Sequence, residues 1–534
     1  MRDMKRIHLF FAVLFLLGLS GCYEDKGNYD FTSINEVAFD EFPKNLELDQ
    51  FDQLVINPSF TGSLYDKDES KYEYEWRMNS KVIANTRDLD YQIQESLGSY
   101  TLRYTITDKE NQTKAFATAQ LLINSSTSSD GILVVSNQYG KADFSYLRLD
   151  KEGVSFAPMF YNRTHDEPLA TNVTQLTQTF VDGYPSYVTK YGGQGIKLIA
   201  DEGLLRFSNV DLEPAGKIDE QFFLEFGSLY PIPDYSQYKP TYLASFISQW
   251  RRTPYGSIMN NEYTYIISED GTYIISYSRN GAPSIYSYLK DSDYRLSPMS
   301  FETGRSIPAN YNNNVYASWS GTSRRGVFDE NTGQFFVYYF GDMKAVDATQ
   351  VFPGYKAFYG EDTYQSLLCF SAISNGSNSK LCSFDLNQEI PKVASVDASL
   401  VSAKSRFFML RNLPYVYFNT AKGLYKYNIL NVASGIAPAG SDQILSLQDF
   451  GYDASATITD ISLHRGEKKM LVSVSRYNTD EDGNGSELKG DILEINLEGT
   501  APKLINKWVG VCGAKALVIY KYRTFARNDE EYVD

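Results

Sequence analysis

One segment of the sequence has the residue types and the spacing of a calcium-binding loop. Residues 480–491 read DEDGNGSELKGD, and oxygen-bearing side chains recur at alternate positions of its first half. Calcium prefers oxygen ligands, and a glycine at the sixth position, here Gly485, allows the sharp turn that brings such ligands together. The candidate ligands for Ca²⁺ are Asp480, Asp482, Asn484, Ser486 and Asp491.

The same segment departs from the calcium-loop pattern at two positions. Position nine is Leu488, and position twelve is Asp491, where the pattern has the longer glutamate. We also expect strands rather than helices on either side of it. These departures favour an acidic tip between two strands, with a Ca²⁺ site as the alternative.

Two other segments combine tryptophan with paired arginine in a chain that is otherwise acidic. Tryptophan and arginine are favoured at recognition surfaces, because they stack well and because the guanidinium donates two parallel hydrogen bonds to a carboxylate. A structural tryptophan with arginines that neutralise nearby acids explains the pattern equally well. The candidate residues for ligand or partner contact are Trp250, Arg251, Arg252, Trp319, Arg324 and Arg325.

A cysteine ends the apolar N-terminal segment. Three basic residues precede an apolar run over residues 10–17, which is too short to span a bilayer, and the small residue Gly21 stands before Cys22. This is the pattern of a bacterial lipoprotein signal, in which Cys22 is acylated and becomes the first residue of the mature chain. An ordinary secretory signal with a chance cysteine is the alternative. We predict a signal peptide over residues 1–21.

The charge balance excludes several classes of partner. The 534-residue chain has a formal net charge of −16, and removal of the signal leaves 47 basic and 65 acidic residues, a net charge of −18. A chain this acidic is a poor match for nucleic acid, which needs clustered lysine and arginine. It also argues against a basic helix lying on anionic lipid, so the predicted membrane attachment is the N-terminal lipid alone.

Side chains for hydrolytic catalysis are scarce. After the signal, the histidines are His165 and His464, both in polar contexts where we expect solvated side chains, and no G-x-S-x-G or H-E-x-x-H motif occurs. Paired carboxylates that act on a glycosidic bond stay an alternative, because the many acidic residues form many pairs and only geometry selects one. The sequence favours binding over catalysis.

Alternation of apolar and polar residues with a period of two predicts that much of the chain forms β-strands. Residues 22–37 are polar and predict a tether, and residues 38–124 alternate like an antiparallel sandwich. In the segment YEYEWR from Tyr72, the tyrosines and Trp76 point to one face and the charges to the other. Residues 125–130 are rich in serine and predict a linker.

Residues 131–534 repeat a short apolar hairpin about every fifty residues and contain no convincing long amphipathic helix. This spacing predicts a β-propeller of about seven or eight blades, with a pair of large β-sandwiches as the alternative. Cys369 and Cys382 flank the turn at residues 374–378, so a disulfide across that hairpin stays open, and Cys512 is left without an obvious partner. The fold class is therefore all-β.

The N-terminal half of this pattern resembles a known family. A tryptophan on a central strand and a later G-x-Y-x-L strand (residues 98–108) resemble the polycystic-kidney-disease (PKD) type of immunoglobulin-like domain. The acidic residues directly after Cys22 resemble the export tag of Bacteroidota lipoproteins that reach the outer face of the outer membrane. Together with the long β region, the chain resembles the PKD-like lipoprotein family of Bacteroidota.

The resemblance implies a function. Members of that family are found with SusC/SusD-type importers, in which a TonB-dependent barrel carries a lipoprotein lid. It implies a lipid-anchored, surface-facing accessory subunit, in contact with the importer and other surface lipoproteins, that binds a nutrient, plausibly an oligopeptide or a glycan. It transfers no catalytic residues. The alternative is a surface glycoside hydrolase or lyase that uses carboxylates on a propeller face.

Overall fold

The computed structural model divides the chain into two compact units. Unit 1 comprises Met1–Glu47, Gln53–Tyr91 and Ser99–Leu122, and unit 2 comprises Leu48–Asp52, Gln92–Gly98 and Ile123–Asp534. The main boundary is close to the predicted one at residue 124. The structure describes residues 33–138, 140–149, 156–179, 195–217, 239–252, 257–269, 273–279, 282–289, 294–297, 306–307, 324–339, 342–362, 368–385, 390–410, 413–464, 466–476, 488–499 and 501–522.

Unit 1 is built around an antiparallel sandwich, as the alternation predicts. A five-stranded sheet has the order β2-β9-β8-β5-β6, and two strand pairs, β1-β4 and β3-β7, complete it. The inward residues of β5 are the tyrosines and Trp76, which confirms the predicted face. The elements are β1 (Val37–Glu41), β2 (Asn45–Asp49), β3 (Gln53–Ile56), β4 (Ser59–Gly62), η2 (Glu69–Lys71), β5 (Tyr72–Met78), β6 (Lys81–Ala84), β7 (Leu89–Gln92), β8 (Gly98–Asp108) and β9 (Lys114–Asn124).

The core of the sandwich forms where the two motif strands meet. Trp76 of β5 lies opposite Tyr104 of β8, and the two rings stack with centroids 4.3 Å apart. Both side chains are fully buried. The indole N–H of Trp76 donates to the carbonyl oxygen of Thr86 at 3.0 Å, so its polar atom is satisfied in the core.

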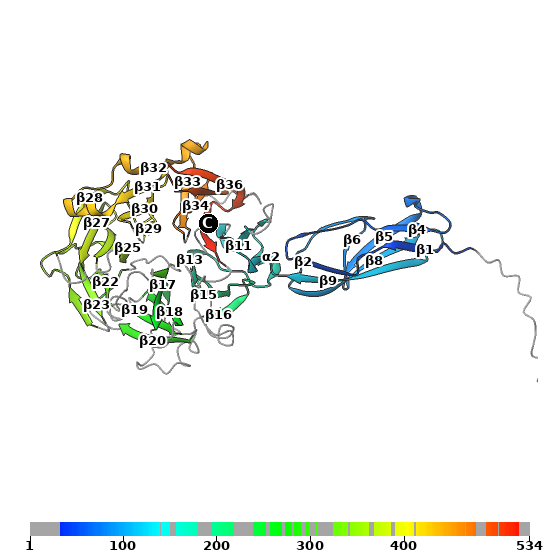
Figure 1. Ribbon diagram of the computed structural model, residues 1–534, viewed down its shortest axis with the longest axis horizontal. Helices are drawn as coiled ribbons and strands as arrows, with labels where there is room; N and C mark the ends of the chain where they lie inside the picture. The colour runs from blue at the N-terminus through cyan, green and yellow to red at the C-terminus, as the bar shows by residue number, and fades with distance from the viewer. Residues whose placement is uncertain are drawn as a thin grey trace, which may run out of the picture. The chain divides into compact units, whose positions relative to one another are not determined.

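Unit 2 carries a propeller, with seven sheets in the described part of the chain. The sheets lie around a common centre, with strands such as β25 and β29 toward the centre and β28 and β32 toward the rim (Figure 1). We number the blades in chain order from the first. Their strands are β10 (Gly131–Gln138), β11 (Lys141–Arg148), β12 (Phe156–Ala157), β13 (Val173–Thr179), β14 (Gly195–Ala200), β15 (Gly203–Ser208), β16 (Pro214–Lys217), β17 (Pro240–Arg252), β18 (Ser257–Ser268), β19 (Tyr273–Arg279), β20 (Ala282–Leu289), β21 (Ser306–Ile307), β22 (Arg324–Asp329), β23 (Gln334–Tyr339), β24 (Asp342–Ala345), β25 (Lys356–Asp362), β26 (Leu368–Ser374), β27 (Asn378–Asp385), β28 (Lys392–Asp397), β29 (Phe407–Met409), β30 (Tyr415–Asn419), β31 (Gly423–Asn428), β32 (Gln443–Ser446), β33 (Thr457–Leu463), β34 (Lys469–Ser475), β35 (Gly490–Asn496), β36 (Lys503–Cys512) and β37 (Lys515–Lys521).

Helical turns are few and short in the described residues. One α-helical turn, α2 (Tyr161–Thr164), follows β12. No helix in the described residues is long and apolar enough to cross a membrane. The 3₁₀ turns of unit 2 are η3 (Ser126–Ser128), η6 (Ile429–Ser434), η7 (Gly440–Asp442) and η8 (Leu447–Phe450).

The ring is closed by the last described strand. β37 pairs antiparallel with β10 along its whole length, so blade 1 has the order β37-β10-β11-β12. The innermost strand of the first blade therefore comes from the C-terminal region, and the two ends of the propeller share one sheet. Such closure leaves no open edge between the first and last blades.

Side-chain amides join strands of neighbouring blades. Asn137 of blade 1 donates to the carbonyl oxygen of Val173 and accepts from its N–H, both at 2.8 Å. Gln178 of blade 2 does the same for Tyr522, at 2.8 and 3.0 Å. The Gln175 amide likewise donates to the carbonyl oxygen of Leu243 in blade 3 and accepts from its N–H. Each amide gives a partner to one backbone N–H and one backbone carbonyl oxygen that the strand pairing leaves without one.

The predicted linker is held in the propeller. The hydroxyls of Ser125 and Thr127 both donate to the carbonyl oxygen of Val210 at 2.9 Å. The hydroxyl of Tyr146 donates to the carbonyl oxygen of Ser129 at 2.7 Å. Residues 125–130 are thus part of the packed structure of unit 2.

The thiols of the described cysteines are not bridged. Cys369, Cys382 and Cys512 are buried thiols. In the β26–β27 register, Cys369 lies opposite Phe384 and Cys382 opposite Ser371, so the two cysteines are not an opposed pair. The hairpin forms where the sequence predicts it, but no disulfide links its two strands.

Candidate ligand-binding face of the propeller

The first predicted contact segment lies at the end of β17, which has β18 on one side and the short strand β21 on the other. Trp250, Arg251 and Arg252 are the last three residues of β17. β17 pairs with β18 up to Arg252, which lies opposite Ser257, whereas β18 pairs with β19 only from Asn261 onward. The β17–β18 hairpin therefore extends past the third strand of blade 3.

The second segment begins β22 in the next blade. Arg324 and Arg325 are its first two residues, and Trp319 lies outside the described residues. Leu296 forms a bridge with Asp329 and so takes the innermost position of blade 4. β22 is then the second strand of its blade, as β18 is of blade 3.

Strand order places both arginine pairs on one face of the propeller. Blades repeat by rotation about the channel, so the starts of all second strands lie on the same face. β18 starts where β17 ends, because the two strands are antiparallel. Arg251, Arg252, Arg324 and Arg325 therefore lie on a common face, in neighbouring blades. We call the face at which β17 ends and β22 begins the arginine face.

The predicted calcium segment lies almost wholly outside the described residues. It connects β34 and β35, the second and third strands of blade 7. Asp480, Asp482, Asn484 and Ser486 lie outside the described residues. Among the residues that are described, no cluster of three or more histidine, cysteine or acidic side chains is placed to hold a metal.

Asp491, the fifth candidate ligand, is buried on β35 with its carboxylate engaged. Its Oδ2 accepts from the hydroxyl of Tyr452 at 2.9 Å, and its Oδ1 accepts from the backbone N–H of Gly510 at 2.9 Å. The Nε of Arg476 is 3.3 Å from Oδ1. This carboxylate joins three segments of blade 7, and the calcium loop stays a prediction for the remaining four residues.

Both histidines are packed rather than solvated. His165 stacks on Tyr161 with ring centroids 3.8 Å apart, and its Nε2 lies 3.0 Å from Glu213. His464 contacts the rings of Tyr520 and Tyr522 edge-on. Both side chains are thus partly buried against aromatic rings rather than fully solvated.

Two buried carboxyl groups of the propeller accept hydrogen bonds from the backbone. Burial raises the pKa of Asp143 to about 6, and its Oδ1 accepts from the N–H of Asn162 at 3.3 Å. Burial also raises the pKa of Asp460. Its oxygens accept from the Nε of Arg406 at 3.0 Å and from the N–H of Val518 in the closing strand at 2.9 Å. These contacts assign both groups a structural role.

The last residue of the closing strand β37 is a buried lysine, Lys521. The ammonium of Lys521 donates to the carbonyl oxygens of Thr127 and Ser129 and lies 5.5 Å from the ring centroid of Tyr146. Its side chain is fully buried. Burial lowers the pKa of Lys521 to about 7, against the opposing effect of nearby carboxylates.

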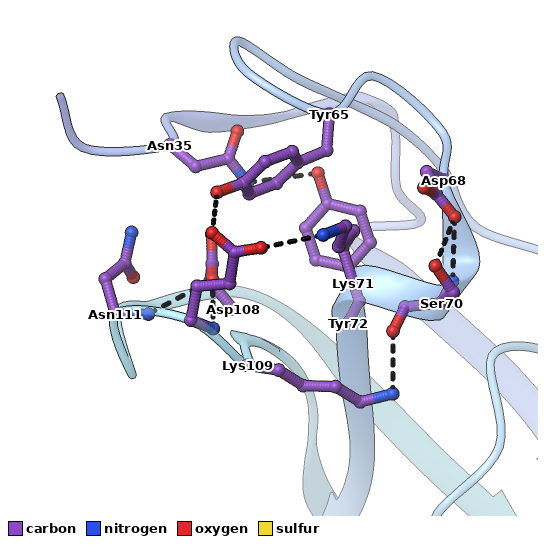
Figure 2. Close-up of polar contacts among 10 residues, drawn as sticks. Asn35, Tyr65, Asp68, Ser70, Lys71, Tyr72, Asp108, Lys109 and Asn111 are labelled. Carbon is purple, nitrogen blue, oxygen red and sulfur yellow. Dashed lines mark hydrogen bonds and ion pairs between the residues drawn. The ribbon is translucent and has the colours of Figure 1, made fainter.

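A second polar surface lies at one end of the sandwich. Figure 2 shows Tyr65 and Lys71 side by side over the turn that contains Asp108. Glu110 of this turn accepts from the Tyr65 hydroxyl at 2.6 Å and from the Lys71 ammonium at 2.7 Å. The bond to Glu110 raises the pKa of Tyr65 to about 12, and the bond from Lys71 lowers the pKa of Glu110.

The N-terminal segment enters the sandwich at this same end. The Asn35 amide donates to the Tyr72 hydroxyl at 3.0 Å and accepts from the N–H of Leu64 at 3.0 Å (Figure 2). Asn35 is 3% exposed, so the chain is fixed from this residue onward. The group of contacts around Glu110 therefore stiffens the end of the domain that is nearest in sequence to Cys22.

The strand ends place both arginine pairs on neighbouring blades of one face. Sequence reasoning found the arginine pairs, but it missed the common face, the amide clamps and the buried Lys521. The glutamine and asparagine positions on predicted strands were the available signal for the clamps.

Solved structures match the chain at low similarity. A "Quinonprotein alcohol dehydrogenase-like protein" from Bacteroides thetaiotaomicron VPI-5482 is 11% identical with a TM-score of 0.44, and the match covers 92% of this chain and 100% of that one. Sqt1 of Chaetomium thermophilum is 10% identical with a TM-score of 0.38, over 72% of this chain and 83% of that one. The propeller assignment rests on the sheets and their closure by β37.

No curated protein matches the chain. The model of the PKD-like family matches residues 22–172. The matched segment starts at the predicted lipidated cysteine, includes the sandwich, and continues through β10–β12 and α2 of the first blade. Residues 22–172 are thus similar to the PKD-like family, and the match ends within blade 1, before β13 begins blade 2.

Proposed function

We propose that this protein is a lipid-anchored, cell-surface lipoprotein of the outer membrane that serves as a non-enzymatic accessory subunit of a SusC/SusD-type importer. In this proposal the sandwich holds the propeller at the importer, and the arginine face binds the nutrient, an oligopeptide in the first instance. The observation that carries the proposal is the N-terminal segment, in which a lipoprotein signal, an acidic tag after Cys22 and a match to the PKD-like family adjoin one another.

The distance from anchor to sandwich supports this arrangement. Asn35, the first residue fixed by side-chain contacts, is thirteen residues after Cys22. A chain of that length spans at most about 45 Å when extended. A lipid on Cys22 would therefore keep the sandwich within a short reach of the bilayer, where a barrel protein is accessible to it.

Attachment and display are tested with the full-length protein in its own cell type. Cys22→Ser should move the protein from the membrane fraction to the soluble fraction, because the thiol that carries the lipid is lost. Intact cells treated with a protease should lose the wild-type protein but keep a periplasmic marker. Retention of the Cys22→Ser variant in the membrane, or protection of the wild type in intact cells, would contradict the proposed location.

Binding without catalysis is tested with purified protein and two pools of ligands. Oligopeptides and oligosaccharides are incubated with the protein and then analysed by mass spectrometry, both for retained and for shortened species. We expect retained, intact peptides. Shortened products that scale with protein concentration would support the hydrolase or lyase alternative instead.

A further inference from the structure

The outer edge of blade 7 is a long strand. β36 is last in the sheet order β33-β34-β35-β36, so in the described residues no strand pairs with its far side. β36 has ten residues, whereas the outer strands β12, β16, β24 and β32 have two to four. β28 has six residues and packs against η6. β36 is therefore the longest outer strand among those that the structure describes.

Apolar side chains of β36 face solvent. Its first five residues are all exposed, among them Leu504 at 37% and Ile505 at 40%. Val509, nearer the other end, is 59% exposed. A long apolar edge strand is a template for another strand, because the N–H and carbonyl groups on its outer side have no strand partner. The edge of blade 7 has the features of a pairing surface.

The polar side chains in the middle of β36 are engaged within the propeller. The Asn506 amide donates to Oε2 of Glu494 at 2.7 Å. The ammonium of Lys507 donates to the carbonyl oxygen of Phe450 at 3.3 Å and lies 4.1 Å from the ring centroid of Tyr452. Lysine guards an edge strand when its charge projects from the edge. Here the central lysine is held against blade 6 instead.

The pattern of β36 is complementary to itself in the antiparallel direction. The segment from Asn506 to Trp508 pairs with β35 without a register shift, so it is the regular part of the edge. If a twofold axis passes directly after Asn506, Leu504 of one copy lies opposite Val509 of the other, and Ile505 lies opposite Trp508. In this register no lysine faces a lysine, and β36 contains no acidic residue. Two copies thus bring apolar side chains together and no like charges.

We propose that β36 pairs antiparallel with β36 of a second copy of this chain, so that the two seventh blades form one continuous sheet. The same surface is used by both copies, and such a contact closes as a dimer rather than extending into a fibre. The inference concerns the propeller alone and does not depend on the proposed function.

The experiment uses the mature chain with Cys22→Ser, which removes the predicted lipid site. Sedimentation velocity is measured from about 1 to about 100 µM, in about 0.15 M salt so that repulsion between the acidic copies is screened. We expect a monomer–dimer equilibrium. Hydrogen exchange of residues 503–509 should slow as the dimer forms, because pairing gives the outward N–H groups carbonyl partners.

Two variants with matched changes test the surface. Ile505→Lys/Val509→Lys places charges on both sides of the axis and should weaken association by about tenfold or more. Ile390→Lys/Leu413→Lys makes the same changes at positions that are 60% and 51% exposed and lie outside blade 7, so it should leave association unchanged. Both changes are at exposed sites, and equal unfolding midpoints would show that both variants keep the fold.

Each result decides the inference. A dimer that is weakened by the β36 variant and not by its control, with slower exchange at residues 503–509, supports it. A wild-type chain that stays monomeric at the highest concentration overturns it, as does a dimer that forms without any change of exchange in β36. A dimer that both variants form as tightly as the wild type overturns it too.

Discussion

Replacing Gln178 with leucine removes the amide that joins β13 to the closing strand β37. The Nε2 of Gln178 donates to the carbonyl oxygen of Tyr522 at 2.8 Å and to the Oδ1 of Asn209 at 2.5 Å, and its Oε1 accepts from the N–H of Tyr522 at 3.0 Å. Gln178 is 5% exposed, so water does not readily replace these bonds. The ring should therefore open more easily in this variant.

The size of the effect follows from the bonds that are lost. Asn209 still donates to the carbonyl oxygen of Tyr522 at 3.0 Å, so this acceptor keeps a donor. The N–H of Tyr522 loses its Gln178 acceptor, and the Oδ1 of Asn209 loses its Gln178 donor. Each buried polar group deprived of a partner costs about 1–3 kcal/mol, so the free energy of unfolding should fall by about 2–5 kcal/mol.

Urea unfolding and hydrogen exchange of residues 515–522 measure the effect. We expect a lower unfolding midpoint, and amide protons of β37 that exchange roughly 30-fold faster or more, as 2 kcal/mol or more implies. Gln448→Leu, at an exposed position of η8, is the matched control and should change stability by less than about 0.5 kcal/mol. A Gln178→Leu protein as stable as its control would refute the role of the clamp.

Three further predictions concern a buried lysine, a tight glycine and the thiols. Burial lowers the pKa of Lys521 to about 7, so between pH 7 and 9 the unfolded chain holds a proton that the folded chain has released. The free energy of unfolding should therefore rise by up to about 1.4 kcal/mol per pH unit over this range. In denaturant titrations at each pH, the Lys521→Met variant should lose this slope. Gly131→Ala places a methyl 2.3 Å from the hydroxyl of Tyr146 and 2.5 Å from the carbonyl oxygen of Leu147, and should lower stability by about 1–3 kcal/mol in thermal unfolding. Burial raises the pKa of the Cys382 thiol, so a Cys22→Ser chain should show no thiol reactive toward Ellman's reagent when folded and three when unfolded.

Each of these three has its own control or contradiction. An unchanged pH slope in Lys521→Met would show that other groups produce it. Gly440→Ala adds a methyl with no atom within 4 Å, so equal destabilisation by the two glycine variants would argue against the clash at Gly131. A single reactive thiol after unfolding without reductant would indicate a disulfide between two of the three cysteines.

The sandwich and the blade hairpins could be predicted because their information is local. Alternation around Trp76 fixes which face is buried, and a short apolar hairpin such as β26–β27 gives the same signal in isolation as it does in the propeller. The closure of the ring could not be predicted in this way. β37 and β10 are both apolar strands, and nothing in their patterns says that partners almost four hundred residues apart pair with each other.

The candidate site was predictable by residue type and not by position. The two arginine pairs were found as unusual segments, but their common face depends on β17 and β22 being the first and second strands of successive blades. Asp491 shows the converse, since the motif named it as a candidate ligand while its carboxylate accepts hydrogen bonds from Tyr452 and Gly510.

Association with an importer is tested most directly by isolating the protein from outer membranes. A tagged, lipid-anchored full-length chain is solubilised in mild detergent, purified, and its stable companions are identified by mass spectrometry. The account predicts a TonB-dependent barrel and its lipoprotein lid in fixed proportion to the chain, with both lost when the Cys22→Ser variant is used. Recovery of the wild-type protein from the outer membrane without either companion would contradict it.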